Sequence, residues 1–170
     1  TALLMTTLAA FGWLVFTMFG GWLSDRIGRV RTFQIGYALI AVWSIPMWFL
    51  IDSGSVALFF IALFVLTIGL GLSYGPQAAL YAEMFPADVR YSGVSIGYAL
   101  GAILGGAFAP LIAELLLSNT GKSWSIGVYV LAITIVSLVA VSLVKETRGT
   151  ALDTHSIDVV AARTAAVKVR

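Results

Sequence analysis

The sequence has 170 residues, of which 60% are hydrophobic and only 11% are charged, with a mean hydropathy of +1.00. Soluble domains carry about 25% charged residues, so this composition excludes a water-soluble globule. The chain contains no Cys, which excludes disulfides and thiol chemistry. The net charge of +2 is no argument for nucleic-acid binding, because what matters is where the ten basic residues lie relative to the apolar runs.

Five uncharged windows are long enough to cross a bilayer. A helix rising about 1.5 Å per residue needs about 20 residues to cross the hydrocarbon layer, and barrel strands would alternate apolar and polar residues, which these windows do not. We therefore predict an all-α, polytopic membrane helix bundle. The predicted spans are about residues 1–23, 32–51, 56–79, 92–116 and 123–144. They form a membrane domain, 1–144, followed by a polar tail, 145–170.

The basic residues predict the orientation of these spans. If residues 25–31 are cytoplasmic, every Lys and Arg except Lys122 lies on the cytoplasmic side, as the positive-inside rule requires. We therefore expect a multi-pass protein of the plasma (inner) membrane, embedded in the lipid bilayer, with a cytoplasmic C-terminus. The odd number of spans and the start at Thr1 lead us to expect a fragment whose N-terminal half is missing.

The first motif lies in the short turn between the first two windows, and it reads GGWLSDRIGRVR from Gly20. Chemistry alone makes this turn a topology anchor, because its arginines hold a hairpin on the cytoplasmic side. Its spacing, G-x-x-x-D-R-x-G-R-x-R, resembles the loop signature of the major facilitator superfamily. The matching residues are Gly21, Asp25, Arg26, Gly28, Arg29 and Arg31.

Two further segments resemble the same family. YAEMFPADVRYSG, residues 81–93, resembles the E-x-F-P-x-x-x-R segment that follows the tenth helix, and KETRG from Lys145 resembles the terminal P-E-T-K/R-G segment, with Lys in place of Pro. The order of the motifs is similar to helices eight to twelve of the twelve-helix fold, in the metabolite–proton symporter branch. This resemblance implies a secondary active transporter that carries a small metabolite, such as a carboxylate or a betaine, with a proton by alternating access.

The resemblance also implies that the charged loops close the cytoplasmic side as a latch. We hypothesise that Glu83 pairs with Arg29 and Arg90, and that Asp25 faces the start of the fourth span near residues 91–93, where a helix dipole favours an anion. The predicted latch comprises Gly21, Asp25, Arg26, Gly28, Arg29, Glu83 and Arg90. The alternative is a set of solvated loop charges, each of which contributes little.

Small residues recur in two spans. In the fourth span a stripe at intervals of four predicts close helix packing, and it also permits sliding. This stripe consists of Gly93, Gly97, Gly101 and Gly105. In the third span, Gly69, Gly71 and Gly75 precede Pro76, which removes one backbone hydrogen bond, so we expect a weakened helix there.

Polar residues near that weak point are the predicted substrate contacts. They are Tyr74, Gln77 and Tyr98, and the alternative is that they form hydrogen bonds between helices. Glu114 is the one ionisable residue inside a predicted span, so it is a possible proton relay, although an interfacial carboxylate is ordinary there. The coupling acid is expected mainly from the missing half.

Other classes of protein have less support. No nucleophile–base pair, metal-ligand set or pair of acids converges in the sequence, so we predict no enzyme, no cofactor and no metal site. The single histidine, His155, lies in the polar tail. The remaining alternative is a truncated or remnant half-transporter with a structural role, or with no transport activity alone.

Overall fold

A computed structural model describes residues 2–86 and 88–146, and every regular element in these ranges is a helix. The predicted tail from residue 147 onward, including His155, lies outside the described residues. The elements are α1 (Ala2–Ile27), α2 (Arg29–Trp43), α3 (Pro46–Asp52), α4 (Val56–Tyr74), α5 (Gln77–Met84), α6 (Arg90–Ala102), the π-helix η1 (Ile103–Ala107), α7 (Phe108–Thr120) and α8 (Trp124–Ser142).

In the described ranges, four helical segments are long and apolar enough to cross a membrane. A fifth span results if α2 and α3, which meet at a bend of 48°, are counted as one. The α4–α5 pair and the α6–η1–α7 run each form one segment by this measure. The predicted fold class, an all-α membrane helix bundle, is therefore confirmed.

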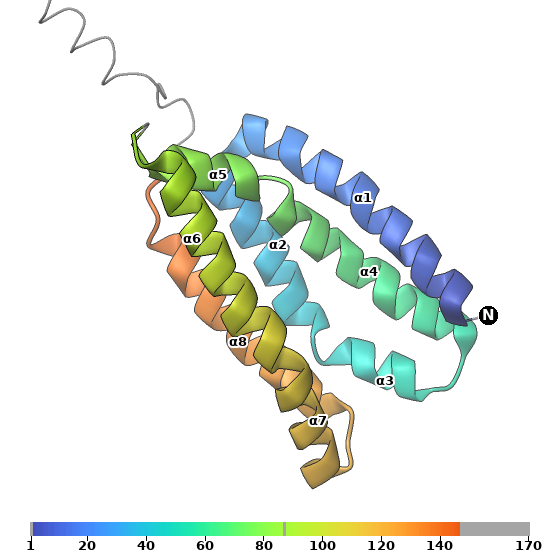
Figure 1. Ribbon diagram of the computed structural model, residues 1–170. Helices are drawn as coiled ribbons and strands as arrows, with labels where there is room; N and C mark the ends of the chain where they lie inside the picture. Colours follow the sequence, from blue (N-terminus) through green and yellow to red (C-terminus); the bar gives the residue numbers. More distant parts are fainter. Residues whose placement is uncertain (1, 87, 147–170) are drawn as a thin grey trace, which may run out of the picture.

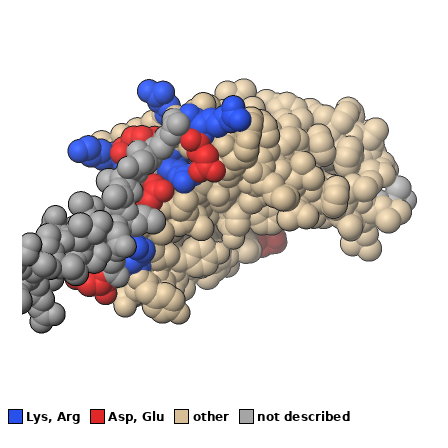
Figure 2. Space-filling view, turned by 90° about the horizontal axis from the view of Figure 1, so that it is seen from above, with Lys and Arg blue, Asp and Glu red and all other residues tan. Residues whose placement is uncertain are grey.

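The helices run roughly side by side along one long axis (Figure 1). Helix α1 lies along α4, α2 packs on both α4 and α8, and α7 contacts α8. The α1–α2 and α5–α6 turns and the end of α8 share one end of the bundle, where α5 also lies. Figure 2 shows acidic and basic side chains gathered at one end of the face in view, and the long remainder of that face is almost uncharged.

Prolines interrupt two of the helices. The second predicted span, 32–51, is broken between Trp43 and Pro46 rather than continuous, because proline lacks the N–H of the helix ladder and its ring clashes with the preceding turn. The third span also contains a proline: α4 ends at Tyr74 and α5 begins at Gln77, with Gly75 and Pro76 between them, but the two helices still form one span-length segment. Tyr74 and Gln77, two polar residues, flank the second interruption.

Glycines allow α1 and α4 to approach closely. A Cβ added to Gly71 would lie 2.5 Å from Phe16 Cβ, and one added to Gly75 would lie 2.4 Å from the backbone nitrogen of Gly21. Nothing larger than hydrogen fits at these points, and small residues of this kind let membrane helices pack tightly. Gly71 and Gly75 therefore have a packing role that the sequence expectation, a softened helix, did not include.

The glycine stripe of α6 has a different environment. A Cβ added to Gly93 would lie 2.6 Å from the ring of Phe85, but no heavy atom of the described ranges lies within 4 Å of a Cβ added to Gly97, Gly101 or Gly105. The stripe lies on the run of helix from Arg90 to Thr120, whose most apolar window contains no buried residue among those described. Only Gly93 makes a close packing contact inside the described part of the chain.

Candidate functional site

A small hollow lies beside the interruption between α4 and α5. Its volume is about 160 Å³, and its wall is contributed by α4, α5 and α6. The lining residues are Tyr74, Gln77, Ala78, Tyr81, Val94 and Tyr98. The structure thus brings the three residues predicted as substrate contacts, Tyr74, Gln77 and Tyr98, around one hollow, although they come from three helices.

A hydrogen bond and a ring contact order the polar groups of this wall. The Gln77 amide donates a hydrogen bond to the Tyr81 hydroxyl at 3.4 Å. The Trp13 ring of α1 meets the Tyr74 ring nearly edge-on, with 5.5 Å between the ring centroids. Tyr74 is 46% exposed and Tyr98 is 51% exposed, so both rings remain accessible.

The wall of the hollow carries no formal charge. None of its lining residues is acidic or basic, and the sequence contains no Lys, Arg or His at positions 32–89 or 91–121. The hollow therefore offers aromatic rings, hydroxyl groups and one amide to a ligand. This chemistry suits binding and orientation rather than bond making or breaking.

Arg29 is the centre of the charged end of the bundle. Its Nη1 donates to Asp25 Oδ1 and, at 2.7 Å, to Ser24 Oγ, while its Nε donates to Glu83 Oε1 at 3.3 Å. The side chains of Arg29 and Glu83 are only 17% and 12% exposed, whereas that of Asp25 is 64% exposed. The contact with Glu83 is the more buried of the two ion pairs, so water screens it less, and it joins the signature turn to α5.

A carboxylate from the far end of the chain caps α2. Glu146, which follows α8, accepts hydrogen bonds from the backbone N–H groups of Arg29 at 2.8 Å and Val30 at 3.2 Å. These two N–H groups lie in the first turn of α2, where no residue within the helix can satisfy them. Gly28 makes room for the carboxylate: its φ is +112°, and an added Cβ would lie 2.5 Å from Glu146 Oε2.

Sequence reasoning assigned no role to Glu146. The residue was noted only as part of the KETRG segment, and its hydrogen-bond partner Arg29 is 117 positions away. No local spacing can predict a contact over that distance. The only signal in the sequence was that the signature turn and the KETRG segment occur in one chain. That signal does not say how close the two segments lie in the fold.

The structure also places the other predicted residues. Arg90 donates from Nε to the carbonyl oxygen of Phe85 at 3.3 Å, and the Arg26 guanidinium lies 4.6 Å from the centroid of the Trp22 ring. Glu114 is exposed on α7, outside the charged end and outside the hollow. Asp25, which was expected to face the start of the fourth span, pairs with Arg29.

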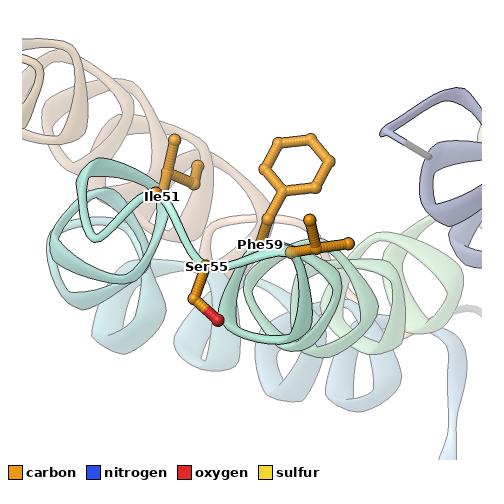
Figure 3. A pocket seen from close by; sticks show the side chains of 5 residues that line it. Ile51, Ser55 and Phe59 are labelled. Atoms are coloured by element: carbon orange, nitrogen blue, oxygen red, sulfur yellow. The ribbon is translucent and has the colours of Figure 1, made fainter.

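A second hollow lies where α3 turns into α4 (Figure 3). The side chains of Ile51 and Phe59 project to one side of the turn, and the Ser55 hydroxyl points to the other. Its lining residues, Ile51, Gly54, Ser55, Val56 and Phe59, include no charged group and only one polar side chain. We assign no role to this hollow.

Comparisons with known proteins agree with the motifs. The family model described as Major Facilitator Superfamily matches residues 1–166. The inner membrane metabolite transport protein YhjE of Escherichia coli K12 is 36% identical over 149 residues, which cover 87% of this chain and 34% of that protein. The shikimate transporter of the same strain is 30% identical over 75% of this chain and 30% of its own length.

The proline/betaine transporter of E. coli K12 is 29% identical over 75% of this chain and 25% of its own length. The chain thus spans about a third or less of these curated relatives. No solved structure matches the chain significantly. With a family model that covers nearly all of its length, the chain belongs to the Major Facilitator Superfamily.

Proposed function

We propose that this chain is the C-terminal part of a secondary active transporter, in which it carries a small metabolite across the plasma membrane by alternating access, coupled to protons. Its membership of the Major Facilitator Superfamily and the names of its relatives, which include shikimate and proline/betaine transporters, support this proposal. The observation that carries it is the neutral hollow at the interruption between α4 and α5.

The position of the hollow suits a transport site. Tyr98 lies eight residues after Arg90 along α6, and at about 1.5 Å per residue this places it about 12 Å from the charged end. Val94 and Tyr81 lie nearer to the charged end, so the hollow extends from that end toward the middle of the hydrocarbon layer, which is about 30 Å thick. Transporters bind their solutes near that midplane, beside interrupted helices. The small metabolite would then contact Tyr74, Gln77 and Tyr98.

The charged end is proposed as the latch of the outward-open state. Arg29 holds the α1–α2 turn to α5 through Glu83, and Glu146 holds the end of α8 to α2. With the positive-inside orientation, this end and the C-terminus face the cytoplasm. Rocking of the two halves would separate the contacts that this end makes with the preceding half. The other predicted latch members are Gly21, Asp25, Arg26, Gly28 and Arg90.

The uncovered stripe of α6 is proposed to pack against a missing N-terminal half. Gly97, Gly101 and Gly105 have open space around them in the described residues, and a helix face without side chains allows another helix to approach closely. Glu114, exposed on α7, is the proposed proton relay of this part, with the main coupling acid in the preceding half.

One observation also favours the second candidate, a truncated half-transporter with a structural role and no activity alone. The relatives are about three times as long as the matched region, and transporters of this kind bind solute between repeats. Uptake by the complete product of the gene separates the two candidates: a product that includes a preceding half and takes up solute supports the first, and a product that takes up no solute supports the second.

The experiment that tests the proposed function uses the complete product of the gene that encodes this chain, purified and reconstituted in liposomes. We expect labelled betaine, proline or shikimate to accumulate when the outside is acidic, and a protonophore to abolish the accumulation. Tyr98→Ala should lose uptake while folding normally, whereas Tyr91→Ala, on the same helix but outside the hollow and 86% exposed, should retain it. Uptake of none of these solutes would refute the proposal.

A further inference from the structure

We infer that Arg90 binds the carboxylate of the transported solute where the solute path reaches the charged end, and so helps to select solutes that carry this group. The inference rests on the proposed function and adds a binding residue outside the first hollow. A further hollow of about 360 Å³ lies at the start of α6, lined by Arg90, Tyr91, Val94 and Ser95. Tyr91 is 86% exposed, so it lies at the rim, and Arg90 is the charged group that this hollow offers.

This Arg90 hollow adjoins the hollow at the α4–α5 interruption, because Val94 lines both of them. Arg90, Val94 and Tyr98 follow one another at intervals of four residues, so they lie on the same side of α6. At about 1.5 Å per residue, Val94 lies about 6 Å and Tyr98 about 12 Å from Arg90 along the helix axis. A solute that moves from the first hollow toward the charged end therefore passes Val94 and reaches Arg90.

Arg90 is the first basic residue that a solute meets on this path. Among the described residues that line the two hollows, it alone carries a formal charge. The sequence has no Lys, Arg or His at positions 32–89 or 91–121, so the helices around the path supply no second positive charge. An anion that loses its hydration needs a compensating partner, and the planar guanidinium matches the two oxygens of a carboxylate.

The contacts of Arg90 place its guanidinium group where a carboxylate can bind it. The Arg90 Nε donates to the carbonyl oxygen of Phe85 at 3.3 Å, which is long for a hydrogen bond of this type. A guanidinium–carboxylate hydrogen bond is shorter and about twice as strong as a neutral one, so a solute can replace this contact. The acidic residue of α5, Glu83, is bonded to Arg29.

A contact with the solute is compatible with the place of Arg90 in the proposed latch. The latch acts while the cytoplasmic side is closed, whereas a departing or entering solute meets Arg90 when that side is open. The two roles differ in a measurable way. Loss of a latch residue changes the binding of every solute, but loss of a carboxylate partner weakens only solutes that carry a carboxylate.

A solute and its primary amide isolate the charge of the carboxylate, because the two molecules have nearly the same shape. The complete protein is purified and titrated in a calorimeter with shikimate or glycine betaine, whichever it accumulates, and with the amide of that solute. We expect the wild-type protein to bind the carboxylate about tenfold more tightly, as for one hydrogen bond to a charged group. Equal affinities for the carboxylate and the amide in the wild type would overturn the inference.

Substitutions locate this preference at Arg90. Arg90→Gln should bring the two affinities together, and Arg90→Lys, which keeps the charge but loses the planar fork, should keep part of the preference. Arg31→Gln is the matched control, because Arg31 is exposed in the first turn of α2, at the same end of the bundle, and lines neither hollow. It should keep the full preference. Equal weakening of both ligands by Arg90→Gln, or loss of the preference in Arg31→Gln, would contradict the inference; if Arg90→Gln does not fold, an unchanged preference in Arg90→Lys would do so.

The lipid and the uptake measurements separate the remaining explanations. The titrations are repeated in nanodiscs of phosphatidylcholine with and without phosphatidylglycerol, whose phosphate is the other anion within reach of this end. An effect of Arg90→Gln that requires phosphatidylglycerol would assign the residue to a lipid head group and overturn the inference. Proton-driven uptake of a solute whose carboxylate and amide bind equally would leave the transporter function in place and refute the Arg90 contact. Failure to accumulate any solute would overturn both.

Discussion

Replacing Gly28 by Ala tests the cap that Glu146 places on α2. Gly28 has φ +112° and ψ 154°, a region of backbone space that is nearly restricted to glycine and costs other residues about 1–3 kcal/mol. The added Cβ would also lie 2.5 Å from Glu146 Oε2, and the flexible carboxylate would move away. The movement breaks two hydrogen bonds to the first turn of α2, and losing a helix cap costs about 0.5–2 kcal/mol.

We therefore expect Gly28→Ala to lower the apparent free energy of unfolding of the complete protein by about 1.5–5 kcal/mol, the sum of strain and lost cap. The assay is denaturation with SDS in mixed micelles. Gly54→Ala is the matched control, because Gly54 also has a positive φ, of +70°, but no atom lies within 4 Å of an added Cβ. Gly54→Ala should lower the free energy of unfolding only by the backbone strain, because no cap is lost there.

A double-mutant cycle separates strain from the cap. In a Glu146→Ala background the carboxylate is already absent, so Gly28→Ala should cost only its strain, and its effect should be smaller by about 0.5–2 kcal/mol than in the wild type. If Gly28→Ala has the same cost in both backgrounds, the Glu146 cap does not exist in the folded protein and the reasoning fails.

Three further predictions concern the latch, the helix packing and the topology. A cycle of Arg29→Gln and Glu83→Gln should give a coupling energy of at least about 1 kcal/mol, because the pair is partly buried; additive effects on SDS denaturation would contradict the pairing. Gly75→Ala should lower the free energy of unfolding in SDS by more than about 2 kcal/mol, because an added Cβ would meet the backbone of α1. Gly101→Ala should lower it by less, because an added Cβ meets no described atom; an equal loss would show that Gly101 packs against another part of the carrier. Ser55→Cys should react with a membrane-impermeant thiol reagent added outside intact cells, because the predicted orientation places residue 55 on the outer side. Labelling only from the cytoplasm would contradict that orientation.

The fold class was predictable because the charges are scarce. Eighteen charged residues, ten basic and eight acidic, leave long apolar windows, and windows of that length have few structural solutions in a bilayer. The bend before Pro46 and the π-helix Ile103–Ala107 were not predicted, since window length says nothing about helix continuity. The sequence did contain a signal at each place, because Pro46 lies at the bend and Pro110 lies just after the π-helix, and proline disturbs the helical hydrogen bonds around it.

The candidate site was predictable in part. Tyr74 and Gln77 could be chosen because they flank Pro76, and Tyr98 because it lies at a similar depth on the next span; the structure places all three around one hollow. Tyr81 was missed as a lining residue, although it lies one turn after Gln77 on the same helix. Its place in the wall depends on how α5 packs against α6.

The roles of the glycines show what the sequence leaves open. Gly71 and Gly75 were expected to soften a helix, but they also contact α1 closely, while Gly97, Gly101 and Gly105 were expected to pack and meet no described atom. A spacing of four gives a smooth helix face in each case. Which face meets a neighbour depends on the positions of the other helices, and those are set by the whole bundle.

The central claim is that the hollow at the α4–α5 interruption contacts the transported solute. The direct measurement is the alkylation rate of Gln77→Cys in a complete protein that has no other cysteine, with and without solute, and with Ser55→Cys at the opposite end as the control. We predict that a transported solute slows alkylation at position 77 over the concentration range that saturates uptake, and leaves position 55 unchanged. An alkylation rate at position 77 that no transported solute alters, in a protein that still transports, would contradict the account.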